Sequence, residues 1–90
     1  MTDPELPSAE DYASLGRALR ALRRDAALTQ KEAAVLIGVR DTFVSQIENG
    51  RRGMRWHTLL AFIDAYNADL HVLANAIERD ERQRPRRRLR

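Results

Sequence analysis

A glycine between two short apolar-periodic segments is the feature that most constrains the fold of this chain, and it lies within residues 29–50. Thr29 and Glu32 have the spacing of a capping box, in which each side chain bonds the other residue's backbone N–H. A helix is therefore expected to begin just after Thr29. Gly38 stands where a left-handed residue can end this helix and turn the chain sharply. A second helix is expected to start shortly afterwards, so the segment predicts two helices joined by a tight turn.

The apolar residues of this segment recur at helical spacing and give each helix one side that can be buried. These sides are expected to contain Ala33, Ala34, Leu36, Ile37, Val44 and Ile47. Ala34 is small at the point where the helices would cross, which allows a close approach. The second helix is then expected to turn four polar side chains outward, namely Thr42, Ser45, Gln46 and Asn49.

Three further helices are predicted in the flanking sequence. The first is capped by Ser8 and buries a stripe formed by Tyr12, Leu15, Leu19 and Leu22. A helix that starts at Trp56, with this residue in the core, is expected to end at Asn67, because asparagine tolerates the left-handed conformation. Asp69 can cap a last helix. The alternation of apolar residues over 70–74 leaves a short strand as the alternative there.

The motif and its flanks resemble the XRE/Cro-like family of phage-repressor-type helix-turn-helix proteins. The matching residues of the motif are Thr29-Gln30, Ala34, Gly38-Val39, Val44-Ser45-Gln46-Ile47 and Glu48-Asn49-Gly50. Residues 15–28 also resemble the family's first helix, and residues 56–70 resemble its fourth helix and the start of its fifth. The resemblance implies an all-α fold, a compact five-helix lambda-repressor-like domain with the helix-turn-helix at helices 2 and 3. It also implies a sequence-specific regulator of transcription that binds double-stranded DNA.

The same resemblance implies roles for individual residues of the motif. Base contacts in the major groove are expected from Asp41, Thr42, Ser45 and Gln46. Phosphate contacts are expected from Gln30, Arg40, Asn49, Arg51, Arg52 and Arg55. Asp41 has an equal alternative role, since a carboxylate there also stabilises the positive N-terminus of a helix. Arg23 and Glu48 match family positions that form a structural ion pair between the first and third helices.

Arg40 and Arg55 depart from the family pattern, which places a capping Ser or Thr before the third helix and commonly a Ser before the fourth. Arginine cannot accept a hydrogen bond from the free N–H groups at a helix start. We expect each site to lose about 1 kcal/mol of local cap stability. In return, each site places a cation beside backbone amides that can share a phosphate.

Charge is distributed unevenly along the chain, although the formal net charge is only +3. Residues 1–11 carry four acids and no base, whereas residues 77–90 carry seven arginines and three acids. We expect residues 1–7 to form a mobile N-terminal arm and residues 8–78 to form the helix-turn-helix DNA-binding domain. Residues 79–90 are expected to be an Arg-rich, disordered tail, because almost nothing apolar is available there for burial.

No catalytic residue, metal site or cofactor is expected. The chain has no cysteine, and His57 and His71 have no neighbouring ligand at metal-binding spacing. It also lacks a phosphate-binding glycine loop and a nucleophile arrangement, so we expect it not to be an enzyme. No apolar run approaches the roughly 20 residues of a membrane span, and the acidic N-terminus lacks the features of a signal peptide. We therefore expect a cytoplasmic protein with no membrane partner.

The function expected from these features is that of a homodimeric repressor on a near-palindromic operator. Each protomer would place its third helix in a major groove, with half-sites about 34 Å apart. The dimer interface is expected to use Leu70, Val72, Leu73 and Ile77. A phage-type repressor, a restriction-modification controller and an antitoxin all fit this pattern.

Two alternatives remain at this level. The chain could be an antitoxin-type interaction module that neutralises a partner protein, such as a toxin, and binds its own promoter. The arginines of residues 84–90 could instead form a non-specific arm for RNA or DNA.

Overall fold

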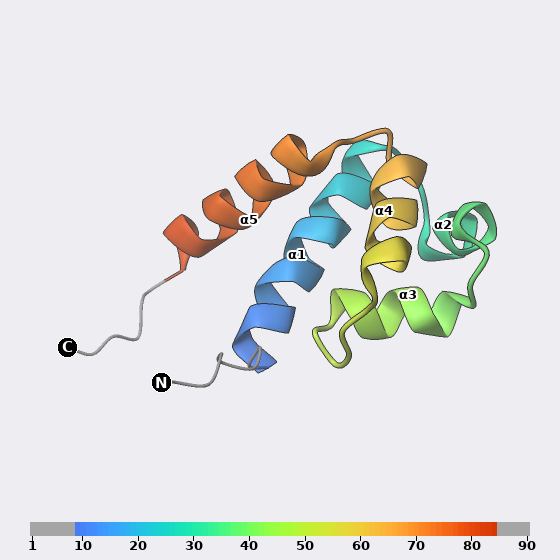
Figure 1. Cartoon of the computed structure of the whole chain (residues 1–90), viewed down its shortest axis with the longest axis horizontal. Coiled ribbons are helices and arrows are strands. Elements are labelled where there is room, and N and C mark those ends of the chain that lie inside the picture. The colour runs from blue at the N-terminus through green and yellow to red at the C-terminus, as the bar shows by residue number, and fades with distance from the viewer. Residues whose placement is uncertain (1–8, 85–90) are drawn as a thin grey trace.

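The computed structural model describes residues 9–84, and over this range the chain forms five helices and no strand (Figure 1). The helices are α1 (Ala9–Asp25), α2 (Gln30–Ile37), α3 (Asp41–Glu48), α4 (Trp56–Ala65) and α5 (Leu70–Gln83). In Figure 1, α5 runs beside α1, while α2, α3 and α4 gather on the other side of α1. The predicted all-α fold is confirmed, and the alternative of a strand over 70–74 is wrong.

Three of the four inter-helix boundaries follow the local signals in the sequence. The capping box is present, with the Glu32 backbone N–H donating to Thr29 Oγ1 over 3.0 Å and the Thr29 N–H donating to Glu32 Oε1 over 2.9 Å. Gly38 takes the left-handed conformation with φ +88°, and Asn67 does so with φ +55°. The Asp69 side chain accepts a hydrogen bond from the Val72 N–H over 2.9 Å. The structure thus confirms the predicted capping of α2 and α5.

The last helix continues five residues beyond the predicted end of the domain, because α5 reaches Gln83. The boundary expected at residue 78 is therefore wrong. The physical reason is an ion pair between Arg17 of α1 and Asp80, with Arg17 Nε 2.9 Å from Asp80 Oδ1. The bonds from Arg17 lower the pKa of the Asp80 carboxyl. The rest of the expected tail beyond Arg84, and the expected N-terminal arm over residues 1–7, lie outside the described residues.

The core is built around the side of α1 that faces α3 and α4. Its largest fully buried side chains are Phe62, Leu19, Ile47 and Val44. Gly16 makes the close approach of α1 to α3 feasible, because a Cβ at this position would meet the carbonyl oxygens of Ile47 and Glu48. The end of α3 is therefore held against the backbone of α1, and any side chain at Gly16 would separate the two helices.

Two apolar side chains expected in the core lie at the surface instead. Trp56 is 56% exposed and Leu36 is 61% exposed. Trp56 is the first residue of α4, and the core contacts of this helix come from Phe62 and Ile63 further along it. Leu36 lies two residues after the buried Ala34 and therefore on the other side of α2, which the other helices leave uncovered. Helical spacing predicts that these helices have apolar residues on one side. It does not predict which of these residues the neighbouring helices bury.

Tyr66 is a buried polar residue with an unmet hydrogen-bonding group. Its ring packs edge-on against Phe62, with 6.0 Å between the ring centroids, and its hydroxyl has no hydrogen-bond partner among the described residues. Burial, reinforced by the negative charge of Glu48, raises the pKa of this hydroxyl above its ordinary value of 10.0. The folded protein therefore favours the neutral phenol.

Replacing Tyr66 by Phe should leave the stability unchanged or raise it by about 1 kcal/mol at pH 7, because the change removes an unpaired buried group. Above pH 10 the wild type should lose stability relative to the variant. Tyr66 ionises there in the unfolded chain but not in the folded one. The difference in the free energy of unfolding between the variant and the wild type should therefore widen by up to about 1.4 kcal/mol per pH unit. Urea denaturation of both proteins between pH 7 and 11.5 measures this gap. A gap that stays constant with pH would contradict the burial of the hydroxyl.

Candidate nucleic-acid interface

A buried ion pair fixes the end of α3 against α1. Arg23 Nε and Nη2 donate to Glu48 Oε2 and Oε1 over 2.6 and 3.0 Å. The two residues are only 8% and 4% exposed. The hydrogen bonds to Glu48 raise the pKa of Arg23. The ion pair that the family resemblance implied between these residues is present.

Two further bonds extend this pair into a network. Arg23 Nη1 donates to the carbonyl oxygen of Leu28 over 2.8 Å, in the turn that leads into α2. Gln30, the first residue of α2, donates through Nε2 to Glu48 Oε1 over 2.9 Å. The carboxylate of Glu48 therefore joins α1, α2 and α3 at one point. Gln30 is half-buried and braces α3 in addition to any contact with a ligand.

The opposite side of α3 carries a polar stripe. Val44, Ile47 and Glu48 are buried, so the residues on the other side of the helix face outward. These are Thr42, Ser45, Gln46 and Asn49, of which Ser45 is half-buried and the others are exposed. Their spacing of three and four residues places them in one row along the helix. Asp41 is half-buried in the first turn. The stripe that the sequence predicted is thus assembled on one face.

Asn49 is already engaged within α3. Its amide nitrogen Nδ2 donates to the carbonyl oxygen of Ser45 over 2.9 Å and approaches Ser45 Oγ at 3.3 Å. The bonds hold Asn49 against the helix end. A contact from this amide to a phosphate would use its remaining capacity or require the side chain to turn away from Ser45.

Four exposed arginines lie at the start of α3 or in the segment between α3 and α4. Arg40 and Arg55 are the N-cap residues of α3 and α4, both have extended backbones, and neither makes a side-chain capping bond. The first N–H groups of both helices are therefore available to an external acceptor. Arg51 and Arg52 follow the end of α3 and are also exposed. The arrangement presents cations at both ends of α3, which suits a polyanion that passes along the helix.

Sequence reasoning missed one contact within this surface. The guanidinium carbon of Arg52 lies 4.5 Å from the centre of the Phe43 ring, and Arg52 Nη1 donates to Gln46 Oε1 over 3.3 Å. The sequence predicts only phosphate contacts for Arg52. Phe43 and Gln46 are three residues apart on α3, so the sequence indicates that they can share a neighbour. It does not indicate that this neighbour is Arg52, because the position of Arg52 depends on the turn that follows α3.

Comparisons with known proteins agree with this geometry. The helix-turn-helix domain family matches residues 14–76. The clp gene regulator ClgR from Corynebacterium glutamicum is 31% identical, with a TM-score of 0.70, over 86% of this chain and 96% of that chain. The restriction-modification controller protein C.AhdI from Aeromonas hydrophila is 28% identical, with a TM-score of 0.68, over 71% of this chain and 97% of that chain. No curated protein sequence is significantly similar to the chain.

A variant of the restriction-modification controller protein C.Esp1396I shares the fold, with a TM-score of 0.76 at 16% identity over 82% of this chain and 94% of that chain. The family match covers well over half of the residues. The chain belongs to the XRE/Cro-like helix-turn-helix family. As a member of that family it is a DNA-binding regulator of transcription, and α2 and α3 are its helix-turn-helix.

Other kinds of site are not found in the part of the chain that the structure describes. Between residues 9 and 84, no group of histidine and acidic side chains is placed to hold a metal ion. None of the five helices combines the length and the apolar character needed to cross a membrane.

Glu48→Gln should destabilise the fold by about 3–5 kcal/mol, because it leaves the buried charge of Arg23 without a counter-ion. Glu78→Gln is the matched control, since Glu78 makes only a solvent-exposed pair with Arg82 at 3.8 Å and should show almost no loss. Chemical denaturation at pH 7 measures both effects. Equal losses in the two variants would show that the Arg23–Glu48 pair does not hold the helices together.

Proposed function

We propose that the protein is a sequence-specific repressor that binds double-stranded DNA as a homodimer on a near-palindromic operator. The observation that carries this proposal is the polar stripe of α3, which faces outward while Glu48 anchors the same helix from behind. A helix of this width fits the major groove, where each base pair presents a distinct pattern of donors and acceptors. The second copy would place its own α3 about one helical turn further along the DNA.

The stripe and its surroundings divide into two sets by chemistry. Asp41, Thr42, Ser45 and Gln46 are proposed to contact base edges. Gln30, Arg40, Asn49, Arg51, Arg52 and Arg55 are proposed to contact phosphates. The arginines of the second set supply affinity without sequence information, while hydrogen bonds from the first set select the sequence. The similar proteins are described as a clp gene regulator and a restriction-modification controller protein, which supports gene control over neutralisation of a toxin.

Selection of bound duplexes from random DNA tests this division. The wild type should select a near-palindrome. Gln46→Ala should relax the preference at one base pair of each half-site, whereas Arg55→Ser should weaken binding to all sequences alike and reduce the log–log salt slope by about 1. Arg55→Ser should also stabilise the free protein by about 1 kcal/mol, because serine can cap α4. Absence of any selected sequence would refute the proposed function.

The surface proposed for the dimer differs from the one that the sequence suggested. Leu73 is only 4% exposed and Ile77 is packed against the core, which disfavours an interface through these two residues. Leu73 and Ile77 face the core, whereas Leu70, the first residue of α5, and Val72 remain at the surface. The proposed contact therefore lies nearer to the start of α5.

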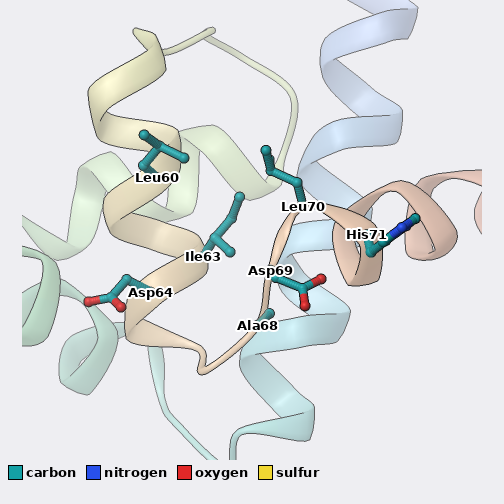
Figure 2. A pocket seen from close by; sticks show the side chains of 7 residues that line it. All are labelled: Leu60, Ile63, Asp64, Ala68, Asp69, Leu70 and His71. Carbon is teal, nitrogen blue, oxygen red and sulfur yellow. The ribbon is translucent and has the colours of Figure 1, made fainter.

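The proposed interface is the α4–α5 surface, which consists of Trp56, Leu60 and Leu70. Leu60, Ile63 and Leu70 line an open hollow of about 480 Å³ between the two helices (Figure 2). Trp56 lies one turn before Leu60 on α4 and on the same side of that helix. Large apolar side chains gathered on one surface favour association. We propose that the α4–α5 surface of a second copy of the chain packs against it.

Leu60→Glu should convert the dimer into a monomer in sedimentation equilibrium experiments and weaken binding to a full operator much more than to a half-site. The introduced charge would have to be buried in the interface without a partner. Val35→Glu provides the control and should remain dimeric, because Val35 is 81% exposed on α2 and does not line the hollow between α4 and α5. A dimer that persists in Leu60→Glu would place the interface elsewhere.

A further inference from the structure

The chain that leaves α3 is held in a defined turn, and this turn brings Arg52 back over the helix. The Gly50 N–H donates to the Ile47 carbonyl oxygen over 3.0 Å, and the Arg51 N–H donates to the Gln46 carbonyl oxygen over 2.9 Å. These are the two bonds of a Schellman motif. Gly50 takes φ +70° and lies so close to Ala13 of α1 that a Cβ would come within 2.8 Å of Ala13 Cα. The position of the turn is therefore fixed by its contact with α1.

Phe43 provides the platform on which Arg52 rests. Its ring lies 6.2 Å from that of Phe62, centroid to centroid, and Phe62 is fully buried. The guanidinium carbon of Arg52 is 4.5 Å from the centre of the Phe43 ring, within the range of a cation–π contact. An exposed arginine is thus connected through one aromatic ring to the core, which restricts its motion relative to α3.

This placement determines which way the amide of Gln46 points. Arg52 Nη1 donates to Gln46 Oε1 over 3.3 Å. A guanidinium carries donors only, so the atom of the Gln46 amide that faces Arg52 must be its oxygen. The NH₂ group of Gln46 then remains for a ligand. The side chain is presented as a hydrogen-bond donor with a positive charge beside it.

A donor of this kind does not read DNA as a free glutamine does. A free glutamine bonds adenine through both ends of its amide, accepting from N6 and donating to N7. Next to Arg52 the oxygen already accepts one hydrogen bond, and the guanidinium repels the N6 amino group of adenine, which would have to donate to the same oxygen. Guanine offers two acceptors, O6 and N7, to the major groove. We propose that Arg52 determines specificity at this position by holding the Gln46 oxygen, so that Gln46 prefers guanine to adenine.

This inference rests on the proposed DNA-binding function, and it assigns to Arg52 a positioning role besides any contact with phosphate. The two roles can be separated because Arg51 is an adjacent, exposed arginine. If charge alone mattered, replacing either arginine by lysine would have similar consequences. If the planar contact with Phe43 and Gln46 matters, only Arg52 would be sensitive.

The test uses the selected operator in four versions, one for each base at the position where Gln46→Ala relaxes the preference. Dissociation constants of the full-length wild type should favour guanine over adenine. Arg52→Lys should move this ratio towards adenine by about tenfold, the usual discrimination of one good base contact. Phe43→Leu removes the aromatic ring but keeps Arg51 and Arg52. It should move the ratio in the same direction. Arg51→Lys should leave the ratio unchanged.

The ratio of affinities is the decisive quantity, because a general loss of phosphate contacts cancels in it. A wild type that prefers adenine, or a ratio that Arg52→Lys does not change, would overturn the role of Arg52 and leave the proposed function intact. A wild type that binds all four duplexes and random DNA equally would overturn the proposed function, and the role of Arg52 with it.

Discussion

The carboxylate of Glu48 is the point on which the arrangement of the helices depends. It is buried at the end of α3, and both of its oxygens are occupied by Arg23 and Gln30. Removing one partner from such a pair is costly, because the remaining charge stays buried. A rotation or shift of α3 would break several of these bonds together. The pair therefore specifies where α3 lies, while the burial of Val44 and Ile47 supplies the hydrophobic contribution to stability.

The dependence on tertiary contacts is strong because α3 is short and poorly capped. It has eight residues, and an isolated helix of fewer than about 12 residues is marginal in water. Its N-cap, Arg40, makes no side-chain bond to the helix. The sequence thus omits the local device that would stabilise this helix alone and places a cation there, next to unpaired N–H groups. Stability comes from the core, and the helix start is left available for an anion.

Features that depend on a few neighbouring residues could be predicted from the sequence, whereas features that depend on distant ones could not. The caps of α2 and α5 and the turn at Gly38 were predicted because each uses residues within one turn of the chain. The exposure of Trp56 and the burial of Leu73 depend on which side of a helix another helix covers. The length of α5 depends on an ion pair across 63 positions. The end of α1 could not be predicted from the local sequence either. Ala27 takes the left-handed conformation there, with φ +60°, although it is neither glycine nor asparagine.

The polar stripe of α3 is therefore supported unequally along its length. Its C-terminal half is fixed from behind by Glu48, from α1 by the close approach at Gly16, and from the following turn by Arg52. Its N-terminal half begins at an uncapped residue. A side chain that selects one base needs a fixed backbone and a fixed rotamer. A side chain that makes adaptable contacts with the DNA needs neither. Gln46 lies in the fixed half and Thr42 in the less supported half, so the structure concentrates its geometric precision at Gln46.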